Sequence, residues 1–328
     1  ATSGSFMDTQ ASPAYYYGFV MRFRTDTQPW TKHWGSYIGP EDYEGQGNPA
    51  TLIKAITVDG NGDAYITGYT SATSFPTTSG AYDETHNDSP SGNNEMDVVA
   101  ARIDSTGTDL IWASYLGGTH NDAGADIALT NGDSLLIVLG YTKSDSFPLE
   151  GDIYSDDFSG NNADVFITAF HADDGSALEY STVIGGLSDD YGHNMCAYDN
   201  CIYVGGYASD VGGNYFPTTT DAFQSEPIDD SEGIAFCFSP SSGYVYGTFI
   251  GGSSFDRVFG IAADSDGGIY LIGSTYSSDF PATRGVFSED LIGDEDAFLL
   301  KLNREMPGRV SSFVATPGHK YISLSWED

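Results

Sequence analysis

The chain has 328 residues and is strongly acidic, with 47 Asp and Glu residues against 12 Lys and Arg and a net charge of −35. This balance argues against nucleic acid and anionic lipid as partners, because phosphate recognition needs clustered cations. Hydrophobic residues make up 40% of the chain and aromatic residues 14%, which excludes a disordered protein, and no apolar run is long enough to span a membrane.

The N-terminal residues 1–39 resemble the second half of a longer repeated unit. Two strands are expected there, at residues 18–23 and 30–38. We interpret this segment as a partial unit that starts between its second and third strands.

Four longer units follow, and self-similarity is the strongest signal in the sequence. Phe-Pro and Gly-Gly recur at corresponding places, which gives a unit of about 64 to 72 residues. The units lie at about 51–118, 123–186, 191–252 and 258–303. Each contains four short runs rich in Ile, Val, Tyr, Phe and Ala and bounded by turn residues, except that the last unit lacks the fourth run.

Tandem four-stranded antiparallel units predict an all-β protein, a β-propeller with little or no helix in which each unit forms one blade. The first strand of each blade is expected to line the centre. A β-solenoid is the alternative fold, but solenoid repeats of β type are usually much shorter.

The fourth unit contains a combination of residues that resembles a known repeat family. It reads Gly251-Gly252, Asp256, Gly260-Ile261-Ala262, Asp264, Gly267, Tyr270, Gly273-Ser274-Thr275, Phe280-Pro281 and Asp296. This pattern is similar to the beta-propeller repeat of large secreted bacterial and archaeal proteins. The resemblance covers about residues 1–303 and implies a cell-surface or extracellular setting, with no established catalytic residues to carry over. We expect a propeller domain over residues 1–305.

The tail, residues 306–328, resembles a linker followed by the first strands of a fibronectin type III domain, with Trp326 as a core residue. A segment this short cannot form the whole sandwich. The incomplete end units leave three arrangements open: closure of the ring by the N-terminal strands, an excerpt of a longer propeller, or edge-to-edge pairing of neighbouring molecules.

Three cysteines are present, and two of them suggest a disulfide. Cys196 and Cys201 flank the stretch Ala-Tyr-Asp-Asn, which is expected to be a hairpin turn. Cysteines that face each other across a hairpin can form a bond, so we predict a Cys196–Cys201 disulfide. Cys237 is expected to be a small buried hydrophobe.

Calcium is the one cofactor that the sequence suggests. Asp122, Asp189, Asp190 and Asp256 follow the Gly-Gly pairs at similar places in their units, and about half of all acids are expected on that face of the blades. Calcium binds six to eight oxygen ligands. The competing interpretation is that these side chains cap the turn by accepting backbone N–H groups. A second candidate calcium site, formed by Asp59, Asn61 and Asp63, lacks the remaining ligands of a calcium loop.

The sequence contains no zinc, Walker or serine-hydrolase motif, so a non-catalytic module is expected. The leading hypothesis is an extracellular structural or adhesion component of a cell surface, surface layer or filament. Its partners would be other copies or other surface proteins that pair with strand edges such as Phe298–Leu302, without nucleic acid or membrane insertion. The alternatives are a carbohydrate-binding, lectin-like propeller and a polysaccharide-active enzyme.

Overall fold

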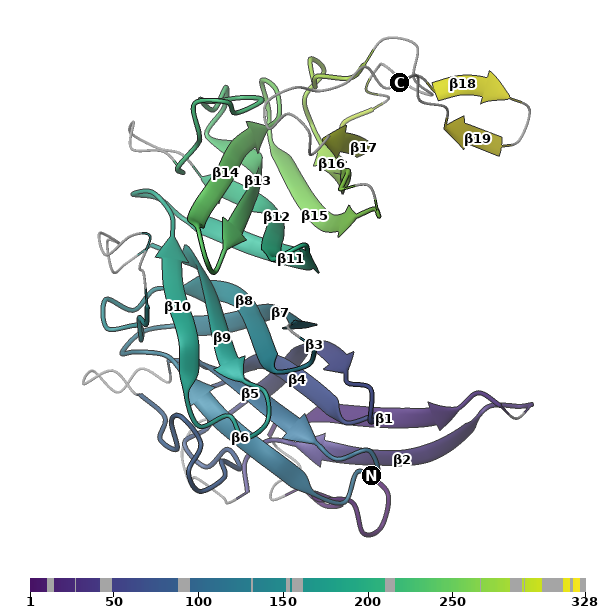
Figure 1. The fold of residues 1–328 in the computed structure, drawn as a ribbon, viewed down its shortest axis with the longest axis vertical. Helices are drawn as coiled ribbons and strands as arrows, with labels where there is room; N and C mark the ends of the chain where they lie inside the picture. Colours follow the sequence, from purple (N-terminus) through teal and green to yellow (C-terminus); the bar gives the residue numbers. More distant parts are fainter. Residues whose placement is uncertain are drawn as a thin grey trace. The chain divides into compact units, whose positions relative to one another are not determined.

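A computed structural model provides the fold (Figure 1). It describes residues 1–10, 15–26, 28–41, 49–87, 95–130, 132–151, 154, 162–209, 216–265, 267–283, 291, 293–302, 315–318 and 321–324. All regular structure in these residues is β-strand, and no helix in them is long and apolar enough to cross a membrane. The sequence contains one N-glycosylation sequon, Asn87-Asp88-Ser89, of which Asn87 is described and the other two residues lie outside the described part.

Three complete four-stranded antiparallel sheets follow one another along the chain, each in simple sequential order. The first consists of β3 (Thr51–Val58), β4 (Ala64–Thr70), β5 (Asp97–Ile103) and β6 (Leu110–Leu116). The second consists of β7 (Asp122–Thr130), β8 (Leu135–Thr142), β9 (Asp164–His171) and β10 (Leu178–Ile184). The third consists of β11 (Asp190–Tyr198), β12 (Cys201–Ser209), β13 (Ser231–Ser239) and β14 (Gly243–Ile250). The predicted all-β class and the four-stranded unit are confirmed.

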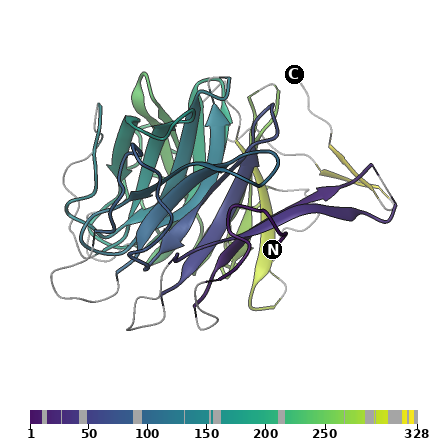
Figure 2. The ribbon, with the colours of Figure 1, turned by 90° about the horizontal axis from the view of Figure 1, so that it is seen from below.

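Incomplete sheets lie before and after these three. The strands β1 (Gly18–Arg24) and β2 (Thr31–Ile38) form a hairpin, whose far end extends beyond the β3–β6 sheet (purple, Figure 2). The strands β15 (Asp256–Ala263), β16 (Ile269–Thr275) and β17 (Asp296–Leu302) form a three-stranded sheet with β17 at its edge. In the tail, β18 (Ala315–Gly318) pairs with β19 (Tyr321–Leu324).

The chain divides into two compact units. The first consists of residues 1–161 and 165–183, and the second of residues 162–164 and 184–328. Within the first unit, β7 packs against β3, β4 and β5, and β3 packs against β1. Within the second unit, β15 packs against β11, β12 and β13. The first strand of a sheet thus lies on the face of the preceding sheet, as expected for consecutive propeller blades.

A bulge and a glycine recur at the same place in every blade. The register of the first strand shifts in β3, β7, β11 and β15. Near each shift, a backbone carbonyl of the first strand lies against a glycine of the second strand. A Cβ added to that glycine would overlap the carbonyl oxygen. The four glycines are Gly68, Gly140, Gly206 and Gly273. The conspicuous glycines of the repeat therefore admit a bulged first strand.

The cysteine hairpin differs from the prediction. Asp199 and Asn200 both have positive φ, 47° and 60°, so they form a two-residue turn instead of the longer turn assumed from the sequence. The register then pairs Tyr198 with Cys201 and Cys196 with Tyr203.

The predicted disulfide is consequently absent. Cys196 and Cys201 are diagonal neighbours in the register, a relation that separates Cα atoms by roughly 7–8 Å in antiparallel sheets. Disulfides need Cα atoms about 4.4–6.8 Å apart. All three cysteines are thiols, and Cys237 is buried as expected.

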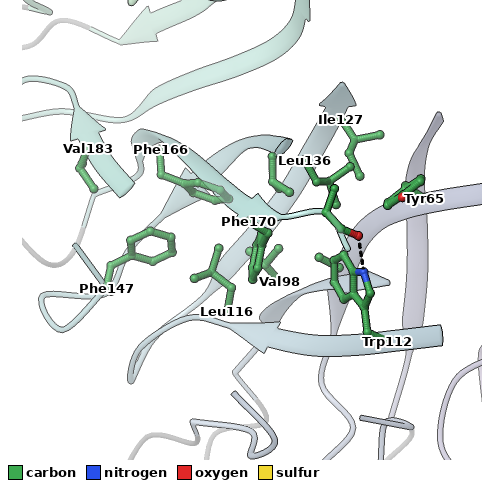
Figure 3. Packing of buried hydrophobic residues seen from close by; sticks show 13 residues of the cluster. Tyr65, Val98, Trp112, Leu116, Ile127, Leu136, Phe147, Phe166, Phe170 and Val183 are labelled. Atoms are coloured by element: carbon green, nitrogen blue, oxygen red, sulfur yellow. Dashed lines mark hydrogen bonds between the residues drawn. The ribbon is translucent and has the colours of Figure 1, made fainter. Parts of the chain in front are cut away.

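The core of the first unit shows how one blade is attached to the next (Figure 3). The indole of Trp112, on β6, is buried and donates its Nε1–H to the carbonyl oxygen of Ala172 at 2.8 Å. It stacks on Phe170 with ring centroids 5.9 Å apart. It also covers Gly175, whose φ is +60° and which has no room for a side chain. Trp34 repeats this arrangement one blade earlier with the Ser105 carbonyl and Gly107.

Candidate ligand-binding surface

The aspartates that follow the Gly-Gly pairs are strand residues, whereas the sequence placed them in loops. Asp122, Asp190 and Asp256 each begin the first strand of a blade and are completely buried. Each accepts the backbone N–H of the second glycine, with N···O distances of 2.7, 2.6 and 2.8 Å. Ser144 and Ser277 also donate to Asp122 and Asp256, both at 2.8 Å. The geometry therefore matches the turn-capping alternative for these three residues.

The neighbouring Asp189 has a different environment. It is partly exposed, and its carboxylate accepts the backbone N–H of Ala163 at 2.7 Å. It therefore supports the start of β9 and does not repeat the capping geometry.

A second acid accompanies each capping aspartate. Asp97, Asp164 and Glu232, near the starts of the third strands, are buried beside the first glycine of the pair. A Cβ built on Gly117 would lie 2.6 Å from Asp97 Oδ1 and 2.8 Å from Asp122 Oδ2, so the glycine separates two carboxyl groups. The same arrangement recurs at Gly185 and Gly251.

Burial shifts the protonation of these acids. It raises the pKa of Asp122 to about 6, and it raises that of Asp164 to about 7 with a further contribution from Asp189. Burial also raises the pKa of Glu232 to about 7 and increases that of Asp256. Neutral carboxyl groups are the expected form in mild acid, because an enclosed charge is poorly solvated.

We expect the protein to lose stability as the pH rises from about 4 to 7. The folded-state pKa values of Asp122, Asp164 and Glu232 lie above the unfolded values near 4, so the folded state binds more protons in this window. The stabilisation that these groups contribute is fully present at a pH below their unfolded-state pKa. It is lost as the pH rises past their folded-state pKa. The new side chain in Asp164→Asn stays neutral at every pH, and among the described residues neither oxygen of Asp164 has a hydrogen-bond partner that the substitution would remove. This variant should unfold at a higher temperature than the parent at pH 8 but not at pH 4.5.

The matched control is Asp145→Asn, which removes one acid from an exposed position. It should leave the difference between the two pH values unchanged. Thermal unfolding followed by circular dichroism measures the effect, and an equal response of both variants would contradict the assignment to burial.

The second calcium candidate is occupied by protein groups. Arg102 donates to Asp63 Oδ2 at 2.8 Å and lies 3.4 Å from Asp59 Oδ2. The other oxygen of Asp59 accepts the backbone N–H groups of Asn61 and Asp63, both at 2.9 Å. Arg102 thus offsets part of the charge of these two carboxylates, and Asn61 contributes a backbone N–H.

Calcium stays a prediction at both candidate sites. In the described part of the chain, no three His, Cys, Asp or Glu side chains are grouped so that they could hold a metal ion.

The most distinctive surface of the second unit is a group of aromatic side chains around Arg257. We call it the aromatic surface, and it consists of Tyr191, His193, Tyr207, Phe255, Phe259 and Tyr276. Tyr191 and Tyr207, which are directly paired on β11 and β12, stack with ring centroids 5.1 Å apart. His193 stacks on Phe259 at 5.5 Å. Phe259 is 49% exposed and Tyr276 is 39% exposed, so the group reaches the solvent.

Arg257 occupies the middle of this surface. Its guanidinium carbon lies 4.4 Å from the centroid of the Tyr207 ring and 4.1 Å from that of Phe255. Phe255 in turn contacts Tyr276 edge-on, with centroids 5.9 Å apart. Stacking on aromatic faces favours Arg and holds its planar fork in place.

The pKa values of two titratable side chains near Arg257 differ from their ordinary values. Burial lowers the pKa of His193, and the charge of Arg257 lowers it further, so a neutral imidazole is expected at pH 7. Its Nδ1 lies 3.0 Å from the Val258 carbonyl oxygen, to which it can donate. The Glu295 carboxylate beside the Tyr276 hydroxyl raises the pKa of that tyrosine.

Sequence patterns did not predict a site at these residues. Arg257 directly follows Asp256, and it is a rare base in an acidic chain, which was an available signal. The aromatic side chains come from β11, β12, the Gly-Gly loop before β15, β15 itself and the residue after β16, and only folding brings them together.

Comparison with known proteins supports the repeat. The beta-propeller repeat family matches residues 34–76 and 245–281. These segments lie around the first and the last Phe-Pro positions of the repeat. No curated protein matches significantly in sequence.

Two solved structures are similar in part. A phage phi92 endosialidase is 10% identical with a TM-score of 0.44, covering 92% of this chain and 41% of that one. A Synechocystis apocarotenoid oxygenase is 12% identical with a TM-score of 0.28, covering 83% of this chain and 66% of that one. The chain thus spans less than half of the endosialidase chain.

The strand order and the repeat match agree. The chain has an all-β fold of β-propeller type, built from four-stranded antiparallel blades. Neither of the two segments matched by the repeat family, residues 34–76 and 245–281, reaches the tail. The fibronectin type III resemblance of the tail stays a prediction.

Proposed function

We propose that this protein is a non-catalytic extracellular binding module that recognises glycans through the aromatic surface. The carrying observation is the exposed group of stacked rings, which includes Tyr276 and Phe259. Aromatic faces pack well against the apolar C–H faces of sugars, while tyrosine hydroxyls and nearby carboxylates can bind the sugar hydroxyls. A cell-surface setting is the expectation that accompanies this role.

The placement of the shifted acids supports binding over catalysis. Asp122, Asp164, Glu232 and Asp256 have the raised pKa values often found in active sites. All four side chains are at most 1% exposed. An acid catalyst has to reach its substrate within hydrogen-bond distance, so these groups are better explained as structural elements of the Gly-Gly turns.

The test is a glycan array followed by titration calorimetry with the oligosaccharides that bind. Tyr276→Ala is expected to weaken binding about tenfold, equivalent to about 1.4 kcal/mol, because it removes an exposed ring from the surface. Tyr154→Ala, at a tyrosine of similar exposure in the first unit, is the control. Absence of binding to every glycan, or release of reducing ends from one of them, would overturn the proposal.

A structural role through self-association is the second candidate. The strand β17 lies at a sheet edge, and β1 exposes Phe19, Met21 and Phe23 on one face. Such edges and apolar rows can pair with other chains. Sedimentation velocity over a range of concentrations tests this role, and a monomer at the highest concentration would contradict it.

A further inference from the structure

Three cations stack more closely on aromatic rings than any others in the described part of the chain. Arg102 lies 5.3 Å from the Tyr65 ring centroid, Lys301 lies 4.7 Å from that of Tyr270, and Arg257 lies 4.1 Å from that of Phe255. The first two belong to the same structural pattern, in which a base on the third strand covers a tyrosine on the second. Arg257 is on a first strand and lies among several rings.

The charge of the first two cations is neutralised within the protein. Arg102 forms ion pairs with Asp63 at 2.8 Å and Asp59 at 3.4 Å. Lys301 forms an ion pair with Asp264 at 3.0 Å. In both of these cases the stacked cation is accompanied by a carboxylate.

Arg257 departs from this pattern. Among the described residues it forms no ion pair and donates no hydrogen bond, and its Nε is buried without an acceptor. Two rings hold the guanidinium, so its donors are pre-organised in one position. A buried donor without an acceptor is costly, so an acceptor supplied by a ligand would be favourable at this position.

We infer that Arg257 binds the carboxylate of an acidic sugar, so that the aromatic surface recognises glycans that contain uronic acid. This inference rests on the proposed glycan-binding function and specifies its ligand. Arginine and carboxylate match as a planar two-point pair. The rings of Tyr207 and Phe255 hold the arginine, and Tyr276 and Phe259 supply exposed faces for the sugar rings.

The acids around the surface favour a sugar over an acidic peptide. The carboxylate of Glu295 lies against the Tyr276 hydroxyl, and Asp294 and Asp189 act on Tyr276 and Tyr207 electrostatically. These groups accept hydrogen bonds and repel further negative charge. Each ring of a uronic acid brings hydroxyl donors for these acceptors along with its carboxylate, whereas a glutamate side chain brings a carboxylate alone.

The inference is tested by calorimetry with three probes: a tri-galacturonate, its methyl ester, and an oligo-glutamate. We expect the galacturonate to bind and the ester, which has the same ring shape without the charge, to bind roughly tenfold to a hundredfold more weakly. Oligo-glutamate should not bind measurably. Equal affinity for acid and ester would overturn the role of Arg257 while leaving glycan binding intact, and binding of oligo-glutamate alone would assign the site to peptides.

Variants separate Arg257 from general charge effects. Arg257→Gln should remove the preference for acid over ester, and Arg257→Lys should keep only part of it because the fork geometry is lost. Lys301→Gln removes the same charge from a cation that stacks on a ring and has its own aspartate, so it should retain the preference. Thermal melts verify that each variant is folded, and an unchanged preference in folded Arg257→Gln would contradict the inference.

Discussion

Replacing Trp112 by alanine is expected to lower the free energy of unfolding by about 3–5 kcal/mol. The indole is 1% exposed, and it packs between Tyr65 and Phe170 (Figure 3). Alanine would leave a cavity at the junction between the β3–β6 and β7–β10 sheets. It would also leave the Ala172 carbonyl without its indole donor.

Denaturant unfolding at constant pH measures this effect. The control is Trp30→Ala, because Trp30 is 62% exposed in the same unit and should change stability by no more than about 0.5 kcal/mol. Trp112→Phe retains part of the packing and should fall between alanine and the parent, which keeps the test informative if the alanine variant does not fold. Equal effects at Trp112 and Trp30 would contradict the proposed role of the buried indole.

Gly68→Ala is expected to destabilise the protein by about 3 kcal/mol or more. The added Cβ would overlap the Leu52 carbonyl oxygen and lie 2.9 Å from Ile53 Cα, and both are backbone atoms of the bulged strand β3. Relief would require β3 to move, and β3 packs between β1 and β7.

Gly60→Ala is the matched control in the same hairpin. The nearest atom to a Cβ at Gly60 is Asp133 Oδ2 at 3.9 Å, so no overlap occurs there. We expect an almost unchanged unfolding midpoint for Gly60→Ala and a large decrease for Gly68→Ala. If the two variants unfolded at the same denaturant concentration, the bulge would have to be more adaptable than its packing indicates.

The calcium hypothesis illustrates how a sequence pattern can identify a position but not its role. The repeated aspartates after Gly-Gly do occupy equivalent places, as the spacing predicted. Their carboxylates are directed to the N–H of the second glycine and to Ser144 or Ser277. Serines more than twenty residues away take part in this capping at Asp122 and Asp256, so the local pattern could not predict it, and calcium binding stays a prediction.

The cysteine hairpin shows the same limit at shorter range. Its strands and its turn were predictable from composition. The number of residues in the turn was not, and a two-residue turn at Asp199 and Asn200 sets the register that keeps Cys196 and Cys201 from facing each other. One assumed residue more or less in a turn changes every cross-strand pair.

The sequence by itself determined the strands, the blade-sized repeat and, for the residues that the structure describes, the absence of helix, because turn residues and apolar runs act on neighbouring residues and recur in every unit. Only the tertiary structure decided which side chains meet. Arg257 is stacked by Tyr207 from the preceding blade and by Phe255 from the Gly-Gly loop. Side-chain contacts between blades depend on the bulges and on how the sheets pack. Such contacts join residues roughly 50 positions apart, and no short sequence pattern predicts them.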